Sequence, residues 1–108
     1  MGSMSIVILQ GVFSVNPEDR DQFVQASIEG MRSSRQEDGC LEYVIAADPL
    51  DPGRVVLSER WESTDHLNQH LQGQSAKRDD SAQDANARPT PLSFEITVYE
   101  VASSRPLR

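Results

Sequence analysis

The first strong segment of the chain, Met4 to Val15, sets the main constraint on the fold. It reads MSIVILQGVFSV, is rich in β-branched residues, and predicts a strand that is apolar on both faces. The two faces consist of Ile6, Ile8 and Val12 on one side and Val7, Leu9 and Phe13 on the other. An antiparallel sheet with one face in water normally alternates apolar and polar residues. We therefore expect both faces of the sheet that holds this strand to be covered.

A helix is predicted directly after this strand. Asn16 is a suitable N-cap, and Pro17 suits the first helical position. The helix is expected to continue to about Gln36, with Gly39 as its stop. Gly30 weakens its apolar stripe, and we expect it to let another group approach closely.

Three further strands and a second helix complete the pattern. The strands are predicted over 40–48, 54–62 and 93–101, and the turn residues PLDPG join the first two as a hairpin. Ser63 caps the second helix, which is expected to end at Gly73. The order strand, helix, strand, strand, helix, strand predicts an α+β fold of the ferredoxin-like β-α-β-β-α-β type. The sheet is antiparallel, with both helices on one face.

The chain length favours a single domain over residues 4–101. Residues 1–3 are interpreted as a cloning scar and 102–108 as a loose tail. The segment 72–91 is polar and contains no large apolar side chain. It is a weak helix on the surface, a lid or a disordered loop, and the sequence does not choose among these.

The charge and composition exclude several classes of partner. The net charge of −7 arises from 17 acidic and 10 basic residues, which disfavours nucleic acid and anionic membrane surfaces. The chain has no apolar run of about 18 residues, so no membrane span is predicted. Its one cysteine, Cys40, has no internal disulfide partner, and we expect a cytoplasmic protein.

The sheet face away from the helices needs a partner of its own. Residues 40–48 resemble the first strand in carrying apolar side chains on both faces, whereas two helices can cover only one face. The economical partner for the other face is the same face of a second chain. The sequence therefore predicts a homodimer packed sheet to sheet.

The segment ERWESTDHLNQH, Glu59 to His70, gathers most of the groups capable of chemistry. Strand parity places Trp61 on the helix side, as a core residue or as the aromatic wall of a pocket. His66 and His70 are four residues apart, but no HExxH pattern or clear third ligand is present, so no metal site is predicted. His70 lies at the edge of an apolar stripe, as a hydrogen-bonded core histidine or as a general base or polar anchor in a cavity.

Two polar residues on the predicted strands are further candidates. Gln10 interrupts an apolar strand face and must find a partner, which is either an interface or backbone group or a ligand. Tyr43 offers a phenol on the second strand, but tyrosine is also common in strands.

The segment 37–70 resembles the antibiotic biosynthesis monooxygenase (ABM) family, including its quinol monooxygenases. An E-x-G-C-x-x-Y pattern leads into the second strand, and an E-x-W-E-S pattern followed by L-x-x-H spans the corner between the third strand and the second helix. The matching residues are Glu37, Gly39, Cys40, Tyr43, Glu59, Trp61, Glu62, Ser63, Leu67 and His70. The resemblance extends from about Met4 to Val101 and is weakest over 72–91.

The resemblance implies a dimeric α+β barrel that oxygenates a small aromatic quinol, phenol or anthrone-type substrate with O₂, without flavin, haem or metal. On this reading Trp61 and His70 are catalytic: Trp61 walls the ring and His70 is a base or hydrogen-bond partner. Gln10, Tyr43 and Glu59 are then substrate contacts.

Two alternatives remain open. One is a non-catalytic dimeric domain that binds an aromatic ligand. The other is a haem-binding or haem-degrading relative, although Gln10 stands where such relatives carry an asparagine.

Overall fold

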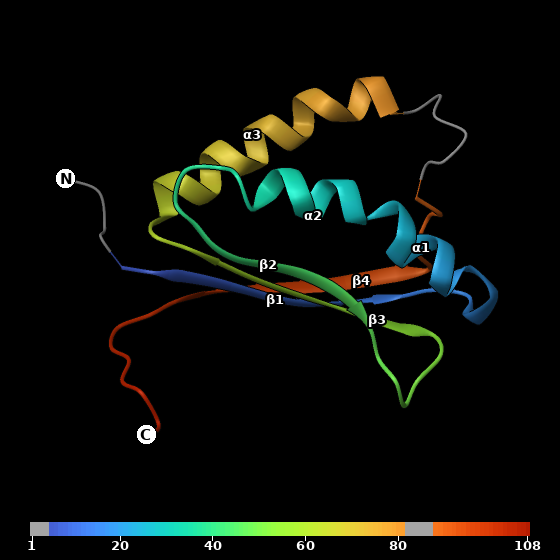
Figure 1. Cartoon of the computed structure of the whole chain (residues 1–108), viewed down its shortest axis with the longest axis horizontal. Coiled ribbons are helices and arrows are strands. Elements are labelled where there is room, and N and C mark those ends of the chain that lie inside the picture. The colour runs from blue at the N-terminus through green and yellow to red at the C-terminus, as the bar shows by residue number, and fades with distance from the viewer. Residues whose placement is uncertain (1–4, 82–87) are drawn as a thin grey trace.

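The computed structural model describes residues 5–81 and 88–108 and has the predicted α+β fold. The predicted scar, 1–3, and part of the polar segment, 82–87, lie outside the described residues. The elements in chain order are β1 (Val7–Ser14), a 3₁₀ turn (Pro17–Asp19), α1 (Arg20–Ala26), α2 (Ile28–Ser34), β2 (Cys40–Ala47), β3 (Arg54–Trp61), α3 (Thr64–Ser81) and β4 (Ser93–Glu100). Figure 1 shows them as one sheet with the helices on a single side.

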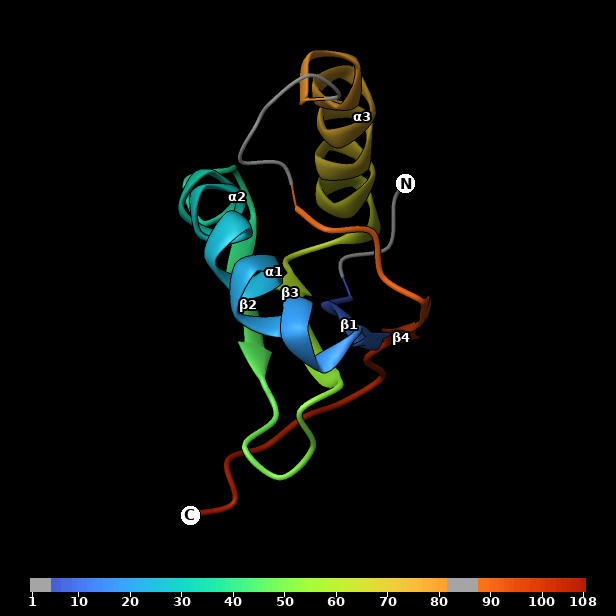
Figure 2. The ribbon, with the colours of Figure 1, turned by 90° about the vertical axis from the view of Figure 1, so that its right-hand side faces the viewer.

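The four strands form an antiparallel sheet in the order β2-β3-β1-β4. The pairing register places Val7 opposite Trp61 and Leu9 opposite Glu59, so these four side chains share a face. Figure 2 shows α1, α2 and α3 on one side of the sheet. The ferredoxin-like prediction is therefore confirmed.

The core lies between the sheet and the helices. Its buried apolar residues are Val7, Leu9, Phe13, Val15, Phe23, Tyr43, Ile45, Val55, Leu57, Trp61 and Leu67. Trp61 and Phe23 are 0% exposed, so the predicted position of Trp61 on the helix side of the sheet is confirmed. Burial of one such large side chain contributes about 1.5–3 kcal/mol to folding.

The first predicted helix is broken at Ser27. The buried Ser27 hydroxyl donates to the carbonyl of Phe23 at 2.8 Å, and its backbone N–H donates to Val24 at 3.0 Å. A serine that bonds back to the preceding turn bends a helix, which the apolar stripe alone does not reveal. Gly30 is exposed, and a Cβ added there would meet nothing within 4 Å. The expected close approach at Gly30 is therefore wrong.

The predicted stop at Gly39 is confirmed. Its φ of 81° lies in the left-handed region that glycine adopts without strain. A Cβ at this position would lie 2.2 Å from the His66 ring. The turn before β2 therefore packs closely against the first turn of α3.

The second predicted helix starts as expected and ends later. The Ser63 hydroxyl accepts the backbone N–H of His66 at 3.2 Å, which is the predicted N-cap. However, α3 passes through Gly73 and continues to Ser81. A glycine weakens a helix but ends it only when the backbone turns left-handed, and in the described residues only Gly39 has a positive φ. Within the same residues, no helix is long and apolar enough to cross a membrane.

Candidate functional site

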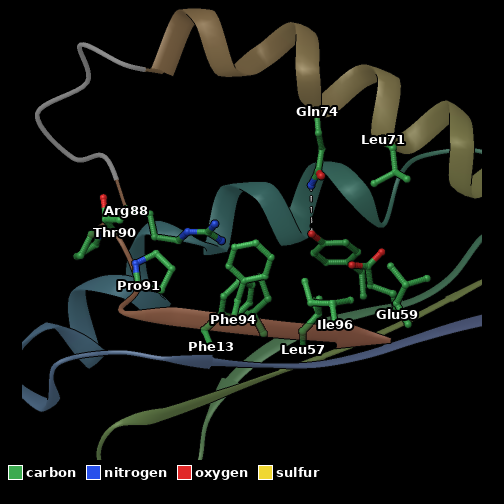
Figure 3. Close-up of a pocket in the computed structure, with 14 residues that line it drawn as sticks. Phe13, Leu57, Glu59, Leu71, Gln74, Arg88, Thr90, Pro91, Phe94 and Ile96 are labelled. Carbon is green, nitrogen blue, oxygen red and sulfur yellow. Dashed lines mark hydrogen bonds between the residues drawn. The ribbon is translucent and has the colours of Figure 1, made fainter. Parts of the chain in front are cut away.

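A cavity of about 460 Å³ lies between the sheet and the helical layer. Its lining residues are Leu9, Phe13, Tyr43, Ile45, Leu57, Glu59, Leu71, Gln74, Arg88, Pro89, Thr90, Pro91, Phe94 and Ile96. Figure 3 shows Phe94, Ile96 and Glu59 on the sheet side, with Leu71 and Gln74 reaching down from α3. An apolar cavity with a few convergent polar groups is the usual form of a small-molecule site.

The Glu59 carboxyl is the buried acid of the cavity wall. Glu59 is 4% exposed and pairs with Tyr43 across the sheet. Its Oε1 accepts the indole N–H of Trp61 at 2.9 Å, because residues two apart on a strand share a face. Burial raises the pKa of Glu59, while the Trp61 hydrogen bond and His70 partly oppose this increase. A carboxylate with a raised pKa is a stronger base toward a weakly acidic ligand.

His70 and Trp61 lie behind this wall. The His70 ring is 3% exposed and packs against Trp61, with centroids 4.6 Å apart, and against the Tyr43 ring at 5.4 Å. Its Nδ1 lies 2.6 Å from Oε2 of Glu37, in the turn after α2. Its Nε2 is buried and has no hydrogen-bond partner among the described residues. His70 is thus anchored on one side only.

Tyr43 supplies the phenol of the cavity. Its hydroxyl accepts a long hydrogen bond, 3.4 Å, from the Gln74 amide on α3 (Figure 3). Burial is the main cause that raises the pKa of this phenol. Tyr43 therefore stays a neutral O–H donor toward a ligand.

Arg88 places a positive charge beside the cavity. Its guanidinium carbon lies 4.6 Å from the ring centroid of Phe23 and 5.2 Å from that of Phe13. These are cation–π distances. Arg88 acts electrostatically on Tyr43, favouring the ionised phenol. Arg88 was not among the predicted site residues, because it lies in the polar segment 72–91, outside any motif.

The predicted site residues fall into three places. Tyr43 and Glu59 line the cavity, and Trp61 and His70 support it from behind. Gln10 is exposed on the opposite face of the sheet, where a shallow depression lies beside Ser58 and Thr97. Gln10 therefore does not reach a ligand in this cavity, because its side chain leaves the sheet on the other side.

Glu37, which holds His70, was not among the predicted site residues. The two residues are 33 positions apart, so no helical or strand spacing connects them. The available signal was the E-x-G-C turn, where Glu37 precedes Gly39 by two positions.

The two histidines face different partners and do not converge. His66 Nδ1 lies 2.7 Å from the Ser63 hydroxyl, and its Nε2 lies 3.4 Å from Asp38. His70 instead faces Glu37. In the described part of the chain, no group of three or more His, Cys, Asp or Glu side chains could hold a metal ion.

Comparisons with known proteins agree with this architecture. The family model for antibiotic biosynthesis monooxygenases matches residues 6–78, which is more than half of the 108 residues. The chain is 24% identical over 107 residues to the uncharacterized protein sll1783 of Synechocystis sp., covering 98% of this chain and 70% of that protein.

Solved structures of similar proteins share this fold. A candidate antibiotic biosynthesis monooxygenase from Deinococcus radiodurans is similar with a TM-score of 0.75 and 26% identity, covering 94% of this chain and 98% of that one. Rv0793 from Mycobacterium tuberculosis is similar with a TM-score of 0.70 and 25% identity, covering 94% and 100% of the two chains. The chain belongs to the antibiotic biosynthesis monooxygenase family.

Proposed function

We propose that this protein is a monooxygenase that oxidises a small phenol, quinol or anthrone-type compound with O₂ in the cavity beside Glu59. The observation that carries the proposal is the Glu59 carboxyl itself, buried in a mainly apolar wall and held by the Trp61 indole. Such a carboxylate is placed to take the proton of a ligand hydroxyl or an activated ring C–H. The ligand anion itself reduces O₂, so the proposed reaction needs no resident cofactor.

The chemistry uses the ligand as its own electron donor. Glu59 takes a proton, and the resulting anion passes one electron to O₂. The radical pair combines into a peroxide on the ring carbon. Loss of water then leaves one oxygen atom on the ring as a carbonyl, and the other oxygen atom departs in the water. In total the ligand loses four electrons and O₂ gains four.

The surrounding residues suit these steps. The neutral Tyr43 hydroxyl, buried in the cavity wall, donates a hydrogen bond to the ligand oxyanion. Buried apolar side chains from β1 and β3, including Phe13 and Leu57, pack against the ring of the ligand. On this proposal Glu59 is the base, and Trp61 and His70 are positioning residues.

Oxygen uptake with a panel of hydroquinone, menadiol and anthrone tests the proposal. We expect uptake with at least one compound and a decrease of about a hundredfold or more in Glu59→Gln, which keeps an acceptor for the indole but removes the base. The control is Glu62→Gln, an exposed acid three positions along the same corner. Equal rates in wild type and Glu59→Gln would rule out the assigned base, and no uptake with the whole panel would contradict oxygenation.

One observation favours a binding-only domain as the second candidate: His70 and Trp61 stand behind the cavity wall. Trp61 is the only tryptophan of the chain, so its fluorescence reports ligands that bind beside Glu59. Saturable quenching by the same panel without oxygen uptake identifies this function. A Soret band that shifts on addition of haem identifies the haem-binding alternative.

A further inference from the structure

The charged groups of the cavity stand at its two ends. Among the described residues that line the cavity, Glu59 is the only acid and Arg88 is the only cation. Figure 3 shows Arg88 reaching into the cavity from the segment before β4, with Glu59 at the opposite end. The side chains between these ends are mainly apolar. The cavity is therefore polarised along its length, from an acid to a cation.

The pairing register gives the distance between these ends. Glu59 pairs with Leu9 on β1, whereas the Arg88 guanidinium lies over the ring of Phe13 on the same strand. Leu9 and Phe13 both line the cavity, and four residues of a strand separate their levels by about 13 Å. A ligand that reaches both charged groups therefore needs two or more fused or linked rings, with a polar group at each end.

The segment that carries Arg88 is fixed before a ligand arrives. Pro89 follows Arg88, and a residue that precedes proline is restricted to extended backbone. The Leu92 N–H donates to the Ser14 carbonyl at 2.7 Å, which ties the end of the segment to β1. The two cation–π contacts, at 4.6 and 5.2 Å, hold the guanidinium itself. A donor held in this way loses little conformational freedom when it binds a ligand.

A guanidinium at this end of the cavity suits an anionic group. Its N–H donors form a planar fork that matches the two oxygens of a carboxylate. The chain carries a net charge of −7, which repels anions, so an anionic ligand depends on a local cation. When ionised as the base, Glu59 repels the same anion from its own end. Charge thus directs a carboxylate to Arg88 and leaves the ligand hydroxyl for Glu59 and Tyr43.

We propose that the cavity selects a phenol or quinol of two or more rings that carries a carboxylate at the end away from the reacting hydroxyl, and that Arg88 binds this carboxylate. The inference deepens the proposed function, on which it rests, by naming the class of its substrate. Arg88 is a specificity-determining residue and takes no part in proton transfer or in the reduction of O₂.

Isothermal titration calorimetry at neutral pH with 6-hydroxy-2-naphthoate and its methyl ester tests the preference. The two probes share one ring system and one hydroxyl, and they differ in the charge at the far end. We expect the intact chain to bind the acid about tenfold or more tightly than the ester, which is the usual gain from hydrogen bonds between charged groups. Equal affinities, tighter binding of the ester, or no binding of either probe would overturn the proposal.

Arg88→Met assigns the preference to this residue. Methionine keeps a flexible apolar chain against the phenylalanine rings and removes the charge. We expect the acid to lose its advantage while the Kd of the ester is unchanged, whereas a purely structural role of Arg88 would weaken both probes alike. The matched control is Arg32→Met, which removes the same charge from an exposed position of α2 and should keep the preference. An acid preference that persists in Arg88→Met would refute the assignment.

Salt gives a readout that needs no variant. Arg88 is exposed, so salt screens its charge, and the acid preference should shrink at high ionic strength while the Kd of the ester stays nearly constant. A preference that salt does not change would contradict an exposed cation as its source.

The binding tests need no O₂, so their outcome is separate from that of the proposed function. An acid preference that depends on Arg88, without oxygen uptake by any phenol or quinol, refutes oxygenation and keeps Arg88 as the specificity residue. Oxygen uptake with neutral quinols, combined with equal binding of the two probes, refutes the anionic substrate class and keeps the monooxygenase.

Discussion

At the scale of single residues, Glu59 and Glu62 show how strongly the fold controls a side chain. They are three positions apart, yet Glu59 is buried and bonded to the Trp61 indole, whereas Glu62 is exposed. Glu59 lies within β3 on the face that packs against the helices, whereas Glu62 follows the end of that strand at Trp61. Burial raises the pKa of Glu59 above that of an unfolded glutamate.

The raised pKa has a consequence for stability. A carboxyl that binds its proton more tightly in the folded state makes the free energy of unfolding fall as pH increases from the unfolded pKa, 4.5, through the folded pKa. Glu59→Gln removes the titrating group. We therefore expect its free energy of unfolding, measured with urea, to fall less steeply with pH above 4.5 than that of the wild type. Glu62→Gln should run parallel to wild type. Parallel profiles for Glu59→Gln and wild type would contradict a perturbed Glu59.

At the scale of elements, the turn between α2 and β2 organises the site. It carries Glu37 toward His70 and Asp38 toward His66, and both histidines are on α3. The left-handed Gly39 makes this approach feasible, because a side chain there would collide with the His66 ring. One glycine therefore sets the distance between this turn and the helix that carries both histidines.

Two glycines of this region should respond in opposite directions to alanine. Gly39→Ala must adopt a left-handed backbone, which costs about 1–2 kcal/mol, and also displaces the His66 ring. Gly30→Ala, in the open middle of α2, should stabilise the protein by about 0.5–1 kcal/mol. Urea unfolding of the two variants measures both effects. Equal effects of the two substitutions would mean that the turn is not constrained as described.

Local patterns predicted the elements well and their tertiary details less well. The strands, the cap at Ser63 and the stop at Gly39 depend on neighbouring residues, so the sequence alone was sufficient for them. The break at Ser27 and the continuation of α3 through Gly73 depend on hydrogen bonds and backbone angles that a periodicity does not encode. The Glu37–His70 pair joins residues far apart in the chain, so only the folded structure shows it.

At the scale of the whole molecule, the sheet has one face without a helical layer (Figures 1 and 2). Val12 on β1 pairs with Val56 on β3, and both are only half-buried on this face. Ile8, Val44 and Ala46 are also half-buried, and Tyr99 is exposed. Contiguous apolar surface of this kind marks an interaction site. We propose that a second copy covers it, as the two-faced apolar pattern of the first strand predicts.

A charge at the centre of this face should prevent the assembly. We expect light scattering at micromolar concentration to give a dimer mass for the wild type and a monomer mass for Val56→Glu, because the carboxylate would be buried without a partner. Far-UV circular dichroism should be unchanged, since Val56 points away from the core. Gln22→Glu adds the same charge at an exposed position of α1 and should remain a dimer. A monomeric wild type, or a dimeric Val56→Glu, would show that this face is not the contact between copies, and the apolar outer residues would then require a different partner.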